Sequence, residues 1–248
     1  METLKRAVKR LAYSAGFQII RTRSSPVGNH KLTDVSKALA RETAPVILDI
    51  GANVGQSVEA FKDLLPQCVI HSFEPSPAAF RELSAVAKNF QNVHPQNVGL
   101  AATPGELELM ENSSSVMNSF LPTGQDGWGN IVNRVKVPVT TVDAYCEAQQ
   151  IRQVSLAKID TQGFDVQVLR GAERTLRAGR VKLVLIEITF SEMYREGASP
   201  DQVYALLREY GFRLVSFYEL QYRNNLADWC DALFCHEAHL EIIGAKSR

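Results

Sequence analysis

Two acidic residues and two glycines sit where predicted strands end, and their spacing is typical of a ligand-binding turn. The segment Asp49-Ile-Gly-Ala-Asn-Val-Gly55 joins an apolar strand to a helix, and its glycines allow a sharp backbone turn with room for a ligand above it. Asn53 stands where the three-glycine dinucleotide fingerprint has its second glycine, and no Walker lysine follows. The turn therefore predicts a bound small molecule without a diphosphate.

The charges around this turn indicate which molecule would bind. Asp49 precedes the turn and Glu74 ends the next strand, so both carboxylates are expected at one edge of a sheet. A carboxylate in the second position can accept both hydroxyls of a ribose, and an acid near the first turn suits a positively charged ligand such as S-adenosylmethionine. The alternative is an ordinary capped turn, but the strand, the helix and Glu74 together favour the cofactor.

The elements that must position these residues alternate between strands and helices. Helices are expected at 56–65, 77–89, 165–177 and 200–210, and strands at 46–50, 69–73, 93–98, 155–160, 181–188, 212–217 and 231–236. Continuous apolar strands in repeated units predict a doubly wound α/β domain with a mostly parallel sheet covered on both faces. A composition of 45% hydrophobic and 22% charged residues excludes a disordered chain, and a net charge of zero provides no field for nucleic acid.

Two segments lie outside this alternation. Residues 1–31 are predicted to be a basic amphipathic helix and a linker, followed by the main domain at 32–248. The helix carries a net charge of +5 over residues 1–23 and is expected either to pack on its own domain or to contact an anionic membrane surface. The chain has no run of about 18 apolar residues and no secretory signal, which predicts a cytoplasmic protein.

A polar insert, residues 112–130, separates two further strands at 106–110 and 134–142. Its length and its content of Ser, Asn and Gly predict a flexible lid. Its polar side chains are candidates for binding a polyol acceptor, and three later tyrosines could form a stacking wall for a sugar or simply pack. The insert candidates are Ser113, Ser114, Ser115 and Asn118, and the tyrosines are Tyr194, Tyr218 and Tyr222.

Four motifs resemble those of the FkbM-type S-adenosylmethionine-dependent methyltransferases. They are Val46-Ile-Leu-Asp-Ile-Gly-Ala-Asn-Val-Gly-Gln-Ser57, Phe73-Glu-Pro-Ser-Pro77, Val137-Pro-Val-Thr-Thr-Val-Asp143 and Lys158-Ile-Asp-Thr-Gln-Gly-Phe-Asp-Val-Gln-Val-Leu-Arg-Gly171. The resemblance implies a class I, Rossmann-like sheet of seven strands with an antiparallel last strand, and methyl transfer to hydroxyls of sugars or polyketides. The fourth motif departs from the family pattern, because Gln162 stands where a glutamate is usual.

The turn and the resemblance together define the expected cofactor site. Its residues are Asp49, Gly51, Ala52, Asn53, Gly55, Gln56, Ser57, Glu74, Pro75, Ser76, Asn97 and Asp160. Among them, Asn97 ends the third strand and is expected near the adenine edge.

Asp160 and Glu187 are the candidate bases for methyl transfer to an alcohol. An alcohol is a poor nucleophile at neutral pH, and a positioned base accelerates its reaction by about 10²–10⁴-fold. Asp160 ends the fourth strand of the main sheet and Glu187 lies in the fifth, so both are expected near the cofactor. Asp160 could instead order a turn, Glu187 could belong to a buried ion pair, and Lys158 is expected to pair with one of the acids.

A metal is not expected, although cysteines and histidines cluster near the end of the chain. Cys230, Cys235, His236 and His239 could bind zinc, but the segment reads as a packed strand and contains no CxxC pair. The sequence therefore predicts a methyltransferase that acts on a hydroxyl of a sugar, glycoconjugate or other small metabolite. The alternatives are transfer to nitrogen or to a carboxylate, or a non-catalytic cofactor-binding subunit.

Overall fold

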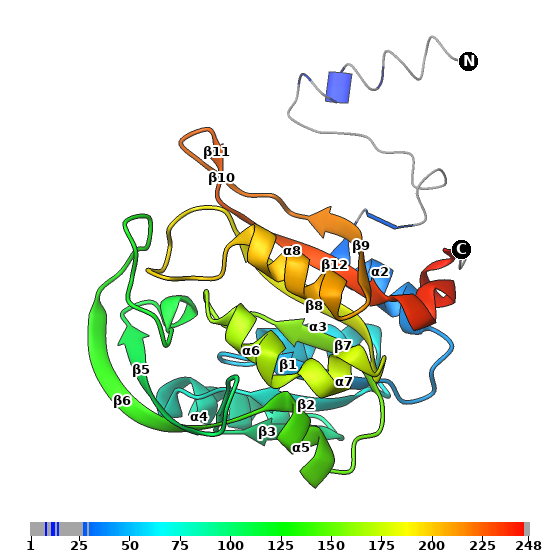
Figure 1. Cartoon of the computed structure of the whole chain (residues 1–248), viewed down its shortest axis with the longest axis horizontal. Coiled ribbons are helices and arrows are strands. Elements are labelled where there is room, and N and C mark those ends of the chain that lie inside the picture. Colours follow the sequence, from blue (N-terminus) through cyan, green and yellow to red (C-terminus); the bar gives the residue numbers. More distant parts are fainter. Residues whose placement is uncertain (1–7, 9–10, 13, 15–26, 29, 246–248) are drawn as a thin grey trace.

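Helices and strands alternate around one large sheet (Figure 1). The computed structural model describes residues 8, 11–12, 14, 27–28 and 30–245. The elements are α2 (Lys31–Leu39), β1 (Val46–Ile50), α3 (Gln56–Leu64), β2 (Val69–Phe73), α4 (Pro77–Ala87), β3 (Val93–Gln96), β4 (Gly99–Leu100), β5 (Gly105–Asn112), η2 (Ser115–Met117), β6 (Ile131–Thr140), α5 (Val142–Ala148), β7 (Val154–Ile159), α6 (Asp165–Gly171), α7 (Glu173–Arg177), β8 (Val181–Thr189), α8 (Pro200–Glu209), β9 (Phe212–Tyr218), β10 (Tyr222–Arg223), β11 (Leu226–Ala227), β12 (Trp229–His236) and η3 (Glu237–Ile243).

The main sheet has seven strands in the order β3-β2-β1-β7-β8-β12-β9. The first five strands of this order pair in parallel, and β12 runs antiparallel to both β8 and β9. The doubly wound α/β sheet with an antiparallel last strand is thus confirmed. The strand order reverses between β1 and β7, which is where ligands bind in such sheets.

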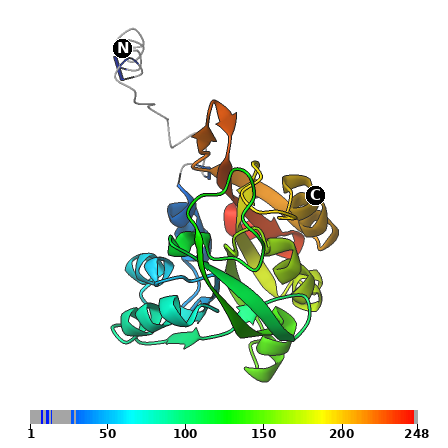
Figure 2. The ribbon, with the colours of Figure 1, turned by 90° about the vertical axis from the view of Figure 1, so that its left-hand side faces the viewer.

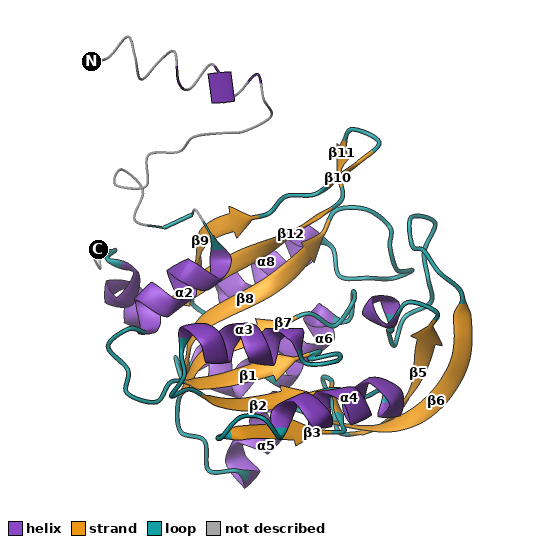
Figure 3. Cartoon of the chain, turned by 180° about the vertical axis from the view of Figure 1, so that it is seen from behind, coloured by secondary structure: helices purple, strands orange, loops and turns teal. Residues whose placement is uncertain are grey.

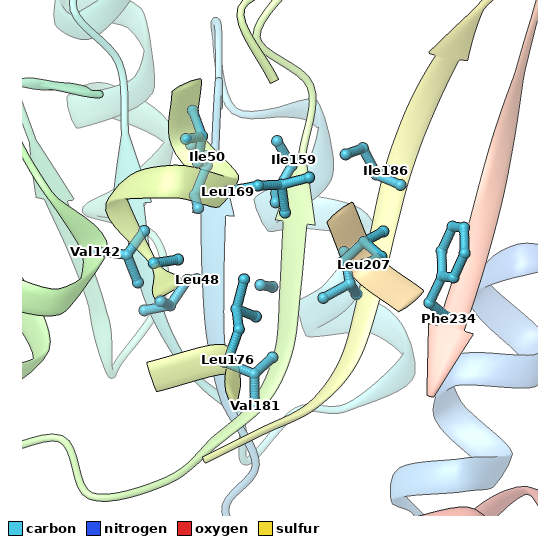
Figure 4. Packing of buried hydrophobic residues seen from close by; sticks show 14 of the residues in the cluster. Leu48, Ile50, Val142, Ile159, Leu169, Leu176, Val181, Ile186, Leu207 and Phe234 are labelled. Carbon is cyan, nitrogen blue, oxygen red and sulfur yellow. The ribbon is translucent and has the colours of Figure 1, made fainter. Parts of the chain in front are cut away.

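Apolar side chains cover both faces of this sheet. Helices α5, α6, α7 and α8 pack on one face, in a cluster that includes Leu48, Ile159, Ile186 and Leu207 (Figures 1 and 4). Helices α2, α3 and α4 cover the opposite face (Figure 3). Alternate residues of each strand enter different clusters, so the sheet is buried on both sides and its polar groups must be paired or must face a cavity.

The polar insert connects two strands of a second, smaller sheet in the order β4-β6-β5. This sheet lies at the side of the main sheet (Figure 2). Its long strands β5 and β6 pair antiparallel and carry between them the connection that reaches the candidate site.

Some expectations about the elements were wrong. The helix expected over 165–177 is two helices, because the backbone at Ala172 leaves the helical region with φ −108° and ψ 5°. The first helix of the folded part, α2, and the short β10–β11 hairpin had no counterpart among the expected elements. Helix α2 begins at Lys31, beside the expected boundary, and the division of the chain into 1–31 and 32–248 stays a prediction.

The basic helix expected in residues 1–23 and its linker lie almost entirely outside the described residues. Among the residues that the structure does describe, no helix is both long enough and apolar enough to cross a membrane.

Gly51 sits where three strands of the main sheet meet. Its N–H donates to the carbonyl of Phe73 at 3.0 Å, and its φ is +79°. A Cβ at this position would lie 1.9 Å from the carbonyl oxygen of Asp160, which follows β7. Glycine is therefore required both by the left-handed backbone and by the close approach of the neighbouring strand.

We expect Gly51→Ala to lower the free energy of unfolding by roughly 2–5 kcal/mol, because backbone strain and an overpacked contact each cost about 1–3 kcal/mol. Gly244→Ala is the matched control, since Gly244 has a φ of +72° but no atom within 4 Å of the position that a Cβ would take. Urea denaturation of both variants gives the comparison. Equal losses would mean that the Asp160 carbonyl can move aside without penalty.

Candidate functional site

A cavity of about 380 Å³ lies at the carboxyl ends of β1, β2 and β7. This is a typical volume for a small-molecule site, and its position is the point where the strand order reverses. Eight of the residues expected to contact a cofactor line it, namely Gly51, Ala52, Asn53, Gln56, Ser57, Glu74, Pro75 and Asp160. The structure thus brings the turn after β1, the end of β2 and the end of β7 to one cavity.

Four expected contact residues do not line the cavity but support its wall. Asp49 is fully buried, and its Oδ2 accepts the hydroxyl proton of Ser57 at 2.8 Å. A Cβ added to Gly55 would lie 3.2 Å from Val86, so this glycine allows α3 and α4 to pack closely. Asp49 and Gly55 therefore contribute to the site by holding the neighbouring helix α3 in place.

Ser76 and Asn97 hold the chain around Glu74. Ser76 caps α4 by accepting the N–H of Ala79 at 3.3 Å. The side-chain amide of Asn97 donates to the carbonyls of Glu74 at 2.9 Å and of Pro75 at 3.1 Å. Asn97 therefore orders the loop that carries Glu74, and the structure does not place it on the cavity wall where an adenine edge was expected.

Lys158 is the central cation of the site. Its Nζ lies 3.5 Å from Asp49 Oδ1 and 3.3 Å from Asp160 Oδ2, and it donates to the carbonyl of Gly51 at 3.1 Å. Burial opposes its charge, but the two carboxylates, Asp160 first, raise the pKa of Lys158 above its ordinary value. Lys158 therefore stays protonated and ties β7 to the turn after β1.

Glu74 is buried and accepts two backbone hydrogen bonds. The N–H of Asn53 donates to its Oε2 and the N–H of Ser76 to its Oε1, both at 2.8 Å. Burial raises the pKa of Glu74 to about 7, although these two hydrogen bonds oppose the shift. A carboxylate oxygen has two lone pairs, so each oxygen can still accept a hydroxyl from a ligand.

The two candidate bases lie next to each other but face different surroundings. Asp160 lines the cavity with a side chain that is 33% exposed. Glu187 does not line it, and burial together with the charges of Asp160, Asp165 and Asp231 raises its pKa well above the ordinary range. Gln162 stands between the two acids, with its Nε2 at 2.6 Å from Asp160 Oδ1 and 3.5 Å from Glu187 Oε1.

The insert covers one side of the cavity through Ser115, Val116, Asn118, Ser119 and Phe120. The Ser119 hydroxyl donates to the carbonyl of Gln162 at 2.7 Å, so this part of the insert is tied to the end of β7. Of the polar residues expected to meet an acceptor, Ser115 and Asn118 line the cavity. Ser113 and Ser114 instead hydrogen-bond the side chain of Asn112.

The three tyrosines do not form a stacking wall. None lines the cavity, and Tyr222 is 66% exposed on the β10–β11 hairpin. Tyr218 is buried and donates its hydroxyl to Asp34 of α2 at 3.0 Å. Tyr194 is buried beside the site and donates to Gln162 Oε1 at 2.7 Å. The three tyrosines therefore differ in burial and lie in different parts of the fold, which the sequence alone did not predict.

The structure separates the two cysteines of the cysteine and histidine cluster. Cys230 and Cys235 fall on opposite faces of the sheet, because they are five positions apart on β12 and alternate residues of a strand point in opposite directions. His236 caps the following turn and His239 bonds the Gly179 carbonyl. The described part of the chain contains no group of three or more His, Cys, Asp or Glu residues arranged to hold a metal.

Lys31 and Asp231 are site residues that sequence reasoning missed. Both line the cavity, and Lys31 Nζ forms ion pairs with Asp231 and, at 2.9 Å, with Glu219. A signal existed for Asp231. It shares one face of β12 with Leu233 and Cys235, which are fully buried, so a charged residue at this alternate position is unexpected unless it has a partner. No local signal identified Lys31, because α2 reaches the site only through the tertiary fold.

The site suits a ligand that carries positive charge and hydroxyl groups. Glu74, Asp160 and Asp231 line the cavity and Asp49 lies behind it, whereas both lysines of the lining are already paired with carboxylates. Asn53 Oδ1 is buried without a hydrogen-bond partner in the described structure, so a bound donor would satisfy it. These properties fit S-adenosylmethionine, with its sulfonium charge and its ribose.

The chain is similar in sequence to known methyltransferases. Residues 49–214 match the methyltransferase FkbM domain. The chain is 26% identical over 191 residues to the 2-O-methyltransferase NoeI of Sinorhizobium fredii, with 71% of this chain and 75% of that protein covered. It is 23% identical over 181 residues to the hexuronic acid methyltransferase AglP of Haloferax volcanii, with coverage of 71% and 67%.

The fold is shared with a solved methyltransferase structure. The METTL16 methyltransferase domain superimposes with a TM-score of 0.51 at 12% identity, and the alignment covers 84% of this chain and 65% of that one. Because the family match spans the glycine turn, Glu74, the insert and the end of β7, the chain belongs to the FkbM methyltransferase family and is an S-adenosylmethionine-dependent methyltransferase.

Proposed function

We propose that the protein transfers a methyl group to a hydroxyl oxygen of a sugar or glycan, with Asp160 as the general base. The observation that supports this most directly is the position of Asp160, whose carboxylate is partly exposed on the cavity wall beside Lys158. Two relatives in the family bear names that describe O-methylation or a hexuronic acid substrate. The acceptor class proposed for this chain is a hydroxyl-rich small molecule.

In this proposal the chain's own residues bind the cofactor, orient the acceptor and remove the proton of its hydroxyl. When bound, S-adenosylmethionine supplies a methyl group that is already activated on a sulfonium. Glu74 would accept the ribose hydroxyls with its remaining lone pairs, and the acid-rich wall would attract the positive charge. Asp160 would take the hydroxyl proton of the acceptor on its carboxylate, while Lys158 holds that carboxylate in place.

The polar lining beside Asp160 supports a hydroxyl-rich acceptor. Ser115 and Asn118 come from the insert, and Gln162 comes from the turn after β7. These side chains are uncharged and both donate and accept hydrogen bonds, as sugar hydroxyls do. Both lysines of the lining are engaged by carboxylates, so a neutral hydroxyl face of the acceptor fits this wall.

The chemical stability of the product tests the transfer to oxygen. Label from the methyl group of S-adenosylmethionine should enter neutral sugars or oligosaccharides as an ether, which mild alkali does not cleave. A methyl ester would release labelled methanol under the same conditions, and an N-methyl product would appear only with amino acceptors. Cofactor binding without label transfer to any acceptor would favour the non-catalytic alternative.

Replacing Asp160 should separate rate from cofactor binding. We expect Asp160→Asn to lower single-turnover methyl transfer by about 10²-fold or more, with cofactor affinity within a few-fold of wild type, because the change removes a proton acceptor at constant size. Glu187→Gln is the matched comparison. Loss of rate in Glu187→Gln but not in Asp160→Asn would assign the base to Glu187, and parallel loss of stability and binding would make Asp160 structural.

The affinity for the cofactor should depend on the ionisation of Glu74. Because its pKa is about 7 without ligand, a ribose that requires the carboxylate should bind up to about tenfold more weakly at pH 6 than at pH 8, with proton release at pH 6. Glu74→Gln should weaken binding at pH 8 by roughly 1.5–3 kcal/mol and remove this part of the pH dependence. Calorimetric titration at both pH values measures it, and identical pH dependence in the two proteins would exclude Glu74 from ribose binding.

A further inference from the structure

Gln162 occupies a turn that is held from two sides. It follows β7 with a left-handed φ of +55°, and its backbone carbonyl accepts the Ser119 hydroxyl at 2.7 Å. The next residue, Gly163, accepts the N–H of Ala198 at 2.9 Å. A non-glycine residue in this region of backbone space is strained and persists where its surroundings fix it. The contacts from the insert and from the loop before α8 supply that constraint.

The side-chain amide of Gln162 has one orientation. Tyr194 donates its hydroxyl to Gln162 Oε1 at 2.7 Å, and the other acceptor within reach is the weaker sulfur of Met117 at 3.2 Å. Burial, and then the charges of Glu187, Asp160 and Asp165, raise the pKa of Tyr194, so its hydroxyl keeps its proton and must donate. The amide oxygen therefore faces Tyr194, and the NH₂ group faces the two acids.

The NH₂ group has two hydrogens and two carboxyl groups within reach. Its nitrogen lies 2.6 Å from Asp160 Oδ1, a short hydrogen bond, and 3.5 Å from Glu187 Oε1, at the limit of one. A donor to a carboxylate stabilises its charged form. The strong contact goes to the acid on the cavity wall and the weak contact to the acid behind it.

The other charged groups reinforce this difference. Asp160 has Lys158 Nζ at 3.3 Å from its second oxygen. Glu187 faces three acids, namely Asp160 after β7, Asp165 on α6 and Asp231 on β12, and the charge of Lys158 on β7 only partly offsets them. Of the nearby cations, Lys158 lies against Asp49 and Asp160, and Lys31 of α2 lies against Asp231 and Glu219. No described cation forms an ion pair with Glu187.

We propose that Gln162 is a positioning residue that keeps two adjacent carboxyl groups in unlike protonation states, with Asp160 held as the carboxylate that faces the acceptor and Glu187 held protonated behind it. The part that concerns proton transfer rests on the proposed role of Asp160 as base. An amide suits this position because it is neutral and donates to both acids. The glutamate usual in the family motif would add a third acid to the pair.

Gln162→Glu tests the proposal by replacing the donor with an acid of the same shape. In single-turnover methyl transfer, the added carboxyl group should make ionisation of Asp160 harder and move the acid limb of the rate–pH profile to higher pH by about one unit or more. At any one pH on that acid limb the rate should therefore fall about tenfold, while cofactor affinity stays within threefold of wild type. Gln167→Glu on α6 is the matched control, because it makes the same chemical change away from the cavity wall, and it should leave the profile unchanged.

A second measurement does not require an acceptor. The infrared spectrum of the wild-type protein at neutral pH should contain the C=O stretch of a protonated carboxyl group. The spectrum of Glu187→Gln should lack this band, so the band should appear in the difference between the two. The same band should shift in Gln162→Glu and in Tyr194→Phe, because both changes disturb the amide contact with Glu187.

The outcomes separate this inference from the proposed function. A wild-type protein without the Glu187 band, or a Gln162→Glu profile that superimposes on wild type, would overturn the inference. Parallel loss of rate and cofactor affinity with no change in the pH profile would also overturn it, because it would give Gln162 a merely structural role. If the band behaves as described but no hydroxyl acceptor is methylated, the positioning role stands and the proposed acceptor is wrong.

Discussion

One largely buried ammonium group, that of Lys158, holds the site together. Lys158 sits on a central strand of the sheet and contacts Asp49 of β1, the carbonyl of Gly51 in the turn and Asp160 at the end of its own strand. Burying this many charged groups is unfavourable unless they are paired, and removing one partner of such a set leaves an uncompensated charge. The geometry of the glycine turn, the approach of the Asp160 carbonyl and the ionisation of the wall therefore all depend on this lysine.

Acids gather in the cavity wall and directly behind it, and the neighbouring lysines compensate their charge only in part. Burial raises the pKa values of Asp49, Glu74 and Glu187, which means that folding opposes their ionisation. For Glu74, whose pKa rises from 4.5 to about 7, this term makes the free protein less stable as the pH rises through that interval. A ligand with a positive charge and hydroxyl donors relieves the same penalty, so the electrostatic strain of the free site is part of its affinity.

Distant segments complete the wall that the central strands begin. The insert between β5 and β6, the start of α2 and Asp231 of β12 all reach the cavity, and each is tied to a neighbour by hydrogen bonds or ion pairs. The turn after β1 and the end of β2 suit the common cofactor. The turn at Gln162 borders Asp160, and the insert is tied to that turn through Ser119.

The sequence by itself determined the sheet, the glycine turn and the acids at the strand ends, because strand periodicity and the need for glycine at a left-handed turn are local properties. Lys158 was also expected to pair with one of the acids, and the structure places it against Asp49 and Asp160. Only the tertiary structure showed that Asn97 holds the backbone, that Tyr218 binds Asp34 and that Lys31 joins the site. It also set the difference between Asp160 and Glu187, since that depends on burial and on charges from three separate parts of the fold, namely β7 with its end, α6 and β12. Such long-range electrostatics leave no pattern in neighbouring residues.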